Sequence, residues 1–168
     1  ITQKEETINE KDGSVMVYIP TGIFLMGNEK NSVSVDAFYI DKFPITNDQY
    51  KKFMVETNYV EPAFWKDKKF NNPDQPVVGV NWDDAVAYAN WAEKKLPEEK
   101  EWEKASRGID GREYPWGNMK PNQSLAVFDL DISIGSPTNV GTHLAGVSPY
   151  GCYDMAGNIW EWCQEWYA

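Results

Sequence analysis

The sequence contains few of the residues on which metal and redox enzymes depend. Its 168 residues include a single histidine, His143, and only two cysteines, Cys152 and Cys163. Zinc and iron sites built on histidine need several of them, so carbonic-anhydrase-like, zincin and two-histidine-one-carboxylate chemistry is excluded within this sequence. Walker-type and G-x-G-x-x-G phosphate loops are missing, as is the G-x-S-x-G elbow of hydrolases.

Basic charge and long apolar runs are also scarce. Lys and Arg number 16 against 26 Asp and Glu, giving a formal net charge of −10. Nucleic-acid and anionic-lipid binders need a basic face, so neither partner is expected. No run approaches the roughly 18 apolar residues of a membrane-spanning helix. The length and the 42% hydrophobic content instead predict one globular domain.

The two cysteines are too few for a disulfide framework. Cys152 and Cys163 lie eleven positions apart, a spacing that matches no familiar ligand or redox motif. We favour two buried thiols. A local disulfide in an oxidising compartment and a redox or metal pair are the alternatives.

The first forty residues predict an arm followed by short strands. Residues 1–14 are polar and charged, which is typical of a loose N-terminal arm or linker. Short β-type runs follow at 15–19 and 23–26, and the Pro20-Thr21-Gly22 step between them predicts a hairpin. Alternating apolar residues over 33–40 predict a third strand.

Helix-start signals occur at three later positions. Thr46 and Gln49 have the spacing of a capping box. Asn81 precedes two aspartates, which favours a second N-terminus there. The step Leu96-Pro97, followed by several glutamates, predicts the opening of a third helix.

Regular patterning fades after the third predicted helix. Residues 108–151 carry Gly, Pro, Asn, Asp and Ser throughout and show no helical or strand period. So long a structureless stretch is unusual in a compact domain. We expect bound ions to order it, since they satisfy loop carbonyls that no ladder satisfies.

Five segments in order resemble the formylglycine-generating enzyme or sulfatase-modifying-factor family. Any one of them is a weak signal, but their ordered combination is specific. They are residues 19–27 (IPTGIFLMG), 38–50 (FYIDKFPITNDQY), 75–85 (QPVVGVNWDDA), 95–108 (KLPEEKEWEKASRG) with 114–117 (YPWG), and 150–162 (YGCYDMAGNIWEW).

The resemblance implies a C-type-lectin-like α+β fold with little regular secondary structure, about three helices and small antiparallel sheets. Two positions depart from the family pattern: Glu98 replaces a capping Thr, and Cys152 replaces a Leu. Active members bind copper(I) through a cysteine pair in a segment beyond Trp166, and Cys152 and Cys163 do not align with that pair. We therefore expect residues 15–168 to form a sulfatase-modifying-factor-like domain that lacks the usual C-terminal catalytic segment.

The resemblance also implies two structural calcium sites. The first would use side-chain oxygens of Asp154 and Glu161 with the carbonyls of Gly157 and Ile159. The second would use Asn122, the carbonyl of Gln123, and an acid from Asp131 or Asp129. Calcium prefers several oxygen ligands, which suits both sets, but caps and solvated turns account for the same residues without an ion. No catalytic residue is assigned, and copper is expected only with a further C-terminal segment.

Six of the eight tryptophans are expected in the core: Trp82, Trp91, Trp102, Trp116, Trp160 and Trp162. The aromatic cluster near residue 168 nevertheless poses a separate problem. Trp160, Trp162 and Trp166 would leave a large apolar patch, so we expect a C-terminal continuation or a partner protein to cover them. Two functions follow. The first is a non-catalytic binding or structural module, an accessory subunit or recognition domain. The second is part of a copper- and oxygen-dependent formylglycine-generating oxidase. Calcium sites suggest an extracytoplasmic (periplasmic or secreted) location.

Overall fold

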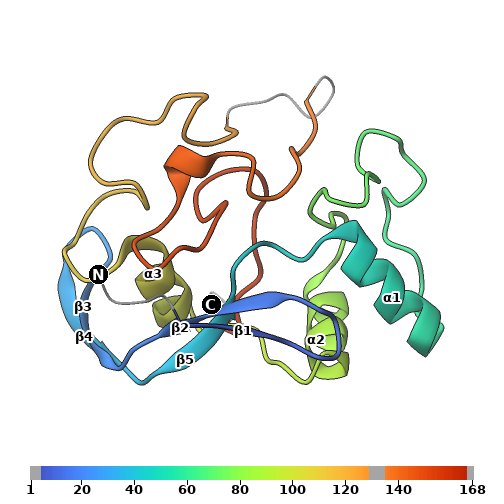
Figure 1. Ribbon diagram of the computed structural model, residues 1–168, viewed down its shortest axis with the longest axis horizontal. Coiled ribbons are helices and arrows are strands. Elements are labelled where there is room, and N and C mark those ends of the chain that lie inside the picture. The colour runs from blue at the N-terminus through green and yellow to red at the C-terminus, as the bar shows by residue number, and fades with distance from the viewer. Residues whose placement is uncertain (1–4, 129–134, 166–168) are drawn as a thin grey trace.

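The computed structural model describes residues 5–128 and 135–165 (Figure 1). Its elements are short and separated by long irregular segments. In chain order they are β1 (Glu6–Ile8), β2 (Val15–Ile19), β3 (Gly22–Met26), β4 (Asn31–Val35), β5 (Phe38–Asp41), α1 (Asn47–Thr57), α2 (Trp82–Trp91), α3 (Glu99–Arg107) and a 3-10 turn at Leu144–Gly146. The predicted α+β architecture, with three helices and small antiparallel sheets, is confirmed.

The strands form two sheets, one in the order β1-β2-β5 and one made of β3 and β4. The hairpin predicted between β2 and β3 is therefore wrong. The link between them turns around the buried ammonium of Lys104, which donates to the carbonyls of Pro20 at 2.6 Å and Gly22 at 3.1 Å. Because these carbonyls bond to Lys104, β3 leaves the first sheet and pairs with β4 instead.

The single strand predicted over residues 33–40 is divided between the two sheets. β4 ends at Val35 and β5 begins at Phe38. In the gap, the Ala37 amide donates to the Thr21 hydroxyl at 2.9 Å rather than to a neighbouring strand. This side-chain bond interrupts the ladder where the alternating pattern continues.

The N-terminal segment is part of the domain. β1 pairs antiparallel with β2, with Glu6 opposite Val17. The Asn9 side chain donates to the Ala92 carbonyl at 3.0 Å, and Asp12 is only 6% exposed. Residues 6–14 therefore do not form the loose arm that their polarity predicts.

The first two helix starts are confirmed at the predicted residues. Thr46 caps α1 and Asn81 caps α2, each in a complete capping box. The third helix begins at Glu99, two residues after the predicted Leu96-Pro97 opening. Its entry is fixed by Glu101, whose carboxylate accepts the Glu98 amide hydrogen at 2.8 Å.

Two buried clusters hold these elements together. Tyr50 of α1 stacks on Tyr88 of α2 with ring centroids 5.7 Å apart. Under the first sheet, Val17 and Ile19 pack against Ala105 of α3 and against Cys152. In Figure 1 the chain after residue 150 runs between α3 and the α1–α2 pair. Within the described ranges, no helix is long and apolar enough to cross a membrane.

Candidate functional site

A cavity of about 530 Å³ lies where four of the motif segments meet. β5, α2, the start of α3 and the segment 153–162 supply its walls. The volume falls within the range of small-molecule and peptide side-chain pockets. Its apolar lining includes Phe38, Ile40, Tyr88, Trp102, Met155 and Trp162.

One wall of the cavity carries a buried ion network centred on Lys94. The ammonium lies 2.7 Å from Asp12, 2.8 Å from Asp41 and 2.6 Å from the Ser14 hydroxyl. Burial opposes ionisation of Asp12, but hydrogen bonds from Lys94, the Ser14 amide and Tyr88 outweigh it and lower the pKa of that carboxyl. Burial raises the pKa of Asp41 despite the same lysine. Two carboxylates thus share one cation, which leaves this wall acidic.

Glu161 also borders the cavity. Its carboxylate accepts a hydrogen bond from the Trp102 indole at 3.1 Å. Surrounding protein atoms raise the pKa of Glu161 to about 7, opposed by the Trp102 bond and increased by the charges of Asp154 and Asp41. The residue keeps solvent contact at the mouth of the cavity. Its carboxyl therefore exchanges protons with solvent near neutral pH.

Two of the expected core tryptophans lie on the surface. Trp160 is 101% exposed and Trp162 is 46% exposed, so the core assignment is wrong for both. The Trp162 indole is held by a bond to the Val80 carbonyl at 3.1 Å. Both rings also border a second cavity of about 580 Å³, which Phe64 and Phe70 line. Apolar surface is therefore present beside Trp160 and Trp162. Trp166 lies outside the described residues. Cover of this surface by a C-terminal continuation or a partner protein stays a prediction.

The first predicted calcium ligands are distributed along one irregular segment. Asp154 adopts a left-handed conformation (φ +57°) and accepts the Gly141 amide hydrogen at 2.7 Å. The Gly157 carbonyl accepts from the Ile159 amide at 2.9 Å. A Cβ at Gly157 would lie 2.2 Å from the Val127 carbonyl oxygen, so only glycine allows this close approach of two loops.

The donor atoms of this segment are oxygens, the kind of ligand that calcium prefers. Two buried polar atoms lack a hydrogen-bond partner among the described residues, the Thr138 hydroxyl and Nδ1 of His143. The charge of His143 lowers the pKa of Asp154, and the Thr138 amide donates to the Asn158 side chain at 2.9 Å. Both residues with an unpaired polar atom therefore lie close to segment 154–158. No three acidic, histidine or cysteine side chains gather there within the described ranges. The calcium site stays a prediction.

The second predicted calcium site is not assembled by the described residues. The Asn122 side chain accepts from the Ser124 amide at 2.9 Å, which forms a local turn. Gln123 is exposed beside it. Asp131 and Asp129 lie outside the described residues, so this prediction remains untested.

The cysteines occupy different surroundings and form no disulfide. Cys152 is fully buried among Val17, Ile19 and Met155. The Cys163 carbonyl accepts from the Trp82 indole at the start of α2 at 2.9 Å. Burial and neighbouring carboxylates raise the pKa of the Cys163 thiol to about 11. Copper(I) prefers two thiolates close together, so these residues do not fit a copper site.

Comparison with known proteins gives one consistent family. Residues 2–168 match the model of the sulfatase-modifying factor enzyme 1-like domain. The chain is 32% identical over 218 residues to a formylglycine-generating enzyme of Thermomonospora curvata, covering 91% of this chain and 72% of that protein. It is also 32% identical to the inactive C-alpha-formylglycine-generating enzyme 2 of Bos taurus, covering 90% of this chain and 71% of that protein.

Length and fold comparisons complete the assignment. The chain spans 58% of the formylglycine-generating enzyme of Bos taurus, to which it is 29% identical over 90% of its own length. PvdO from Pseudomonas aeruginosa superimposes with a TM-score of 0.78 at 20% identity, covering 100% of this chain and 77% of that structure, which shows a shared fold. Because the family model matches nearly every residue, the chain belongs to the sulfatase-modifying-factor, or formylglycine-generating enzyme, family.

Proposed function

We propose that this chain is a non-catalytic member of its family, a binding or structural module that serves as an accessory subunit or recognition domain of a larger protein or complex. The observation that carries the proposal is the state of its two cysteines. Cys152 is fully buried in the core, and the pKa of the Cys163 thiol is raised to about 11. The thiolate is the form that binds copper and attacks substrates. The raised pKa of Cys163 disfavours that form at neutral pH, and burial keeps Cys152 away from solvent.

The relatives do not decide between a catalytic and a non-catalytic role by themselves. The chain is equally similar, at 32% identity, to a relative named as a formylglycine-generating enzyme and to one named as inactive. The chemistry of the described residues therefore has to decide. They provide a formed cavity and exposed tryptophans, which are features of recognition surfaces.

A second candidate function is part of a copper- and oxygen-dependent formylglycine-generating oxidase. The similarity to the Thermomonospora curvata enzyme over 91% of this chain favours it. In that case the copper thiolates come from residues other than Cys152 and Cys163. The described residues would then hold the substrate polypeptide rather than perform its oxidation.

Structural calcium at Asp154 and Glu161 forms part of the proposal. Its role would be to strengthen contacts between loops, because calcium has no redox chemistry. Extracellular calcium modules bind the ion weakly and work where its concentration is high. Calcium at this segment would therefore favour an extracytoplasmic, periplasmic or secreted location.

Copper titration and peptide oxidation test the non-catalytic assignment. The chain is titrated with copper(I) and incubated aerobically with a Cys-x-Pro-x-Arg peptide, with a formylglycine-generating enzyme as the positive control. We expect neither stoichiometric copper binding nor conversion of the peptide cysteine to formylglycine. Tight copper binding that the Cys163→Ser variant loses, or formylglycine detected by mass spectrometry, would refute the assignment and favour the oxidase.

A further inference from the structure

The buried network of Lys94, Asp12 and Asp41, which we call the Lys94 cluster, carries unbalanced charge. The Lys94 ammonium lies 2.7 Å from Asp12 and 2.8 and 3.0 Å from the two carboxylate oxygens of Asp41. The fully ionised cluster therefore holds two negative charges against one positive charge. Because a charge that leaves water without a partner costs free energy, the excess negative charge opposes folding. One bound proton removes that excess.

The polar groups that touch the Lys94 cluster are neutral. The Tyr88 hydroxyl donates to Asp12 at 2.8 Å. The Ser14 hydroxyl lies 2.6 Å from the Lys94 ammonium. Both groups add hydrogen bonds to the cluster, but neither adds a positive charge that would balance the second carboxylate.

The charged groups around Asp41 do not balance it either. The negative charges of Glu161 and Asp41 repel each other. Lys42, the residue that follows β5, pairs with Glu6 at 2.8 Å. The remaining charged residues that border the cavity are Glu93, Lys95 and Glu101, of which Lys95 and Glu101 pair with each other at 3.3 Å. Asp41 thus shares Lys94 with Asp12 and gains no second cation from these neighbours.

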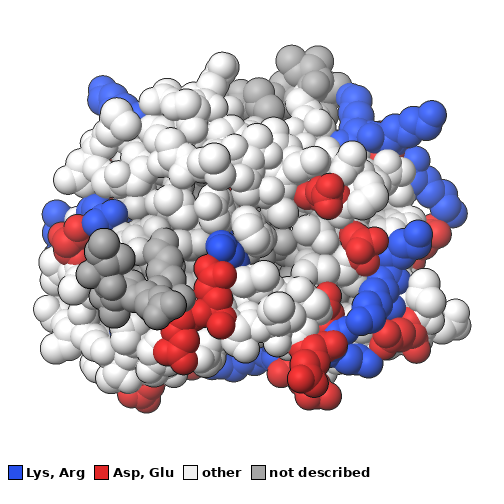
Figure 2. Space-filling view, viewed as in Figure 1, with Lys and Arg blue, Asp and Glu red and all other residues white. Residues whose placement is uncertain are grey.

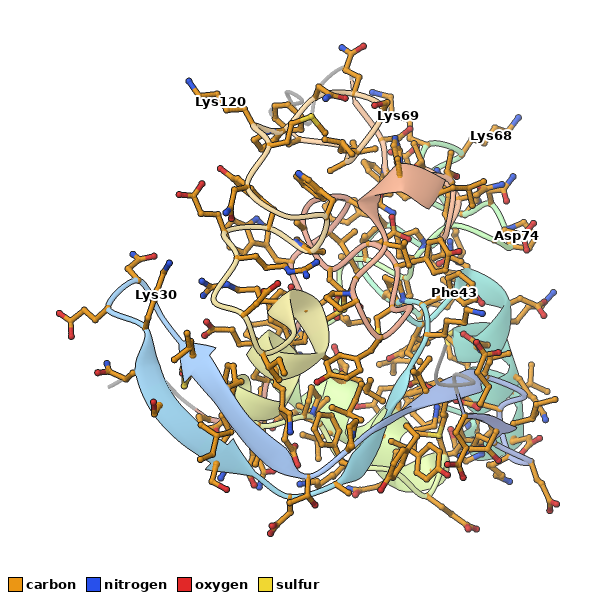
Figure 3. The ribbon with its side chains drawn as sticks, turned by 60° about the vertical axis from the view of Figure 1, so that its left-hand side comes forward. Lys30, Phe43, Lys68, Lys69, Asp74 and Lys120 are labelled. Carbon is orange, nitrogen blue, oxygen red and sulfur yellow. The ribbon has the colours of Figure 1, made fainter. Side chains whose placement is uncertain are left out.

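Lysines at the surface have a different environment. In Figure 2 many Lys and Arg side chains lie along the right-hand edge of the view, next to Asp and Glu side chains. In Figure 3 the labelled Lys30, Lys68 and Lys120 project outward from loops at the periphery of the molecule. Water and salt screen such charges, so they affect stability little. The Lys94 side chain is 9% exposed, so its charge is screened much less.

The Lys94 cluster joins three segments of the chain. Asp12 lies in the turn 9–14 between β1 and β2, Asp41 ends β5, and Lys94 follows α2. In Figure 1 the connection between β1 and β2 lies beside α2. Because the Asp12 side chain is fully buried there, its bond to Lys94 is a main attachment of the turn to the end of α2.

The two carboxyl groups bind a proton at different pH. Burial raises the pKa of Asp41 even with Lys94 beside it. Burial acts on Asp12 in the same direction, but the hydrogen bonds to Asp12 outweigh it and lower the pKa. As pH falls from neutral, Asp41 therefore binds the proton first. A group whose folded pKa is raised contributes stability that is present below the unfolded pKa and is lost as pH rises through the folded pKa.

We propose that the Lys94 cluster is a pH-dependent switch, which holds the turn 9–14 against α2 when a proton is bound at Asp41 and loosens the turn when that proton is lost. With the proton bound, Lys94 and Asp12 form a neutral ion pair. Ionisation of Asp41 places a second negative charge beside Lys94, which repels Asp12 and weakens that pair. The three residues lie between positions 12 and 94 of the sequence, and the switch does not require the proposed binding function.

Hydrogen exchange tests the switch on the unaltered chain. The Asn9 amide donates to the Ser14 carbonyl and the Gly13 amide to the Asn9 carbonyl, so both amides report opening of the turn 9–14. Exchange is measured in chelator from neutral pH to about pH 4, and is corrected for its intrinsic pH dependence. The Phe53 amide inside α1 reports global unfolding. Relative to Phe53, we expect protection of the turn to rise at least about fivefold as pH falls.

Two variants separate Asp41 from the other carboxyl group at the cavity. Asp41→Asn removes the proton site and keeps an oxygen that accepts from Lys94. Protection of the turn should then be independent of pH, and at neutral pH it should equal or exceed that of the parent. Glu161→Gln is the matched control, since Glu161 bonds to the Trp102 indole rather than to the Lys94 cluster, and it should keep the pH response.

A direct titration covers the case in which Asp41→Asn fails to fold by circular dichroism. The side-chain carboxyl carbon of Asp41 is followed by NMR across the same pH range in the unaltered chain. We expect this carboxyl to bind its proton above the ordinary aspartate range.

Four results would overturn the inference. They are protection of the turn that stays constant or falls as pH decreases, a pH response that Asp41→Asn retains, a response that Glu161→Gln abolishes, and an Asp41 carboxyl that titrates within or below the ordinary range. The third result would assign the proton to Glu161. Copper binding and peptide oxidation are measured separately, so failure of the switch and failure of the proposed function are distinguishable.

Discussion

Replacement of Lys94 with Met should destabilise the domain strongly. Lys94 follows α2, and its ammonium binds Asp12 in the N-terminal segment and Asp41 in β5. The Lys94 side chain is 9% exposed and that of Asp12 is 0% exposed. Methionine keeps most of the apolar stem and removes the charge, so the change isolates the ion network from packing.

The size of the expected loss in unfolding free energy follows from the burial of the Lys94–Asp12 ion pair. Removing one partner of a buried ion pair costs about 3–5 kcal/mol, because the other charge stays buried without its partner. The Asp41 side chain is 21% exposed and regains some hydration, which favours the lower end of this range. At about 2–4 °C per kcal/mol for a domain of this size, the melting temperature should fall by roughly 10 °C.

The loss of stability in the Lys94→Met variant should become smaller as pH falls. In the parent protein the hydrogen bonds to Asp12 lower its pKa below the ordinary value. This group contributes stability that is present above the unfolded pKa and is lost as pH falls through the folded pKa. Without Lys94 the buried Asp12 binds a proton more readily, so the variant is penalised less in acid. The stability gap between parent and Lys94→Met should therefore narrow as pH falls from neutral toward the ordinary aspartate pKa.

Urea unfolding across that pH range measures the difference in unfolding free energy between the parent and the Lys94→Met variant. Ser14→Ala is the matched control, because it removes one neutral hydrogen-bond partner of Lys94 and leaves all charges; it should cost about 1.5 kcal/mol. Asp12→Asn introduced together with Lys94→Met should recover part of the loss. A Lys94→Met cost below about 1 kcal/mol that is the same at every pH would refute the reasoning, since that is how an exposed ion pair behaves.

Three further changes test separate features. Thr46→Ala should cost about 1 kcal/mol in denaturant unfolding, because Thr46 caps α1 through the Gln49 amide, and Thr46→Ser should restore most of it. Calcium at about a hundredfold excess over its Kd should stabilise the chain by about 2.7 kcal/mol, and Glu161→Gln should abolish the response; identical melting curves in calcium and in chelator would contradict the site. Cys163, with its pKa raised to about 11, should be alkylated slowly at neutral pH, at a rate that rises about tenfold per pH unit, as followed by mass spectrometry.

Local signals in the sequence predicted local structure well. The capping box predicted at Thr46 and the helix start predicted at Asn81 depend on residues within three positions, and both are confirmed. The hairpin at Pro20 failed because strand pairing was decided by Lys104, which lies 84 positions away from the carbonyl it binds. Turn chemistry indicates where a chain bends, but not which strand it then joins.

The candidate site was only partly accessible to sequence reasoning. The motif at 150–162 directed attention to Glu161 and to the exposed Trp160 beside the cavity. The ion network was missed, since Lys94 meets Asp12 across 82 positions and Asp41 across 53. Each of these residues is an ordinary surface type, and no local pattern marks them as buried together.

The irregular half of the chain is ordered largely by side chains that bond to neighbouring backbone. The Asn158 carboxamide accepts the Thr138 amide at 2.9 Å, and the Asn158 amide donates to the Val127 carbonyl at 2.9 Å. Asp154 accepts the Gly141 amide at 2.7 Å. One segment, 154–158, thus ties together the backbone at residues 127, 138 and 141 without a ladder. Asparagine and aspartate suit this role because their short side chains present oxygen close to the backbone.

The hydrogen bonds of Asn158 and Asp154 limit the contribution that calcium can make to ordering these loops. The loop contacts at Gly141 and Thr138 are made by protein atoms, so they do not require an ion. An ion would bind the carboxylate oxygens of Asp154 and Glu161 that these bonds leave available, and the surrounding protein raises the pKa of both carboxyls. Neutralising two such carboxylates adds stability to contacts that already exist. Chelation should therefore lower the melting temperature and leave the circular dichroism spectrum of the folded chain unchanged at low temperature; loss of that spectrum would mean that folding itself depends on the ion.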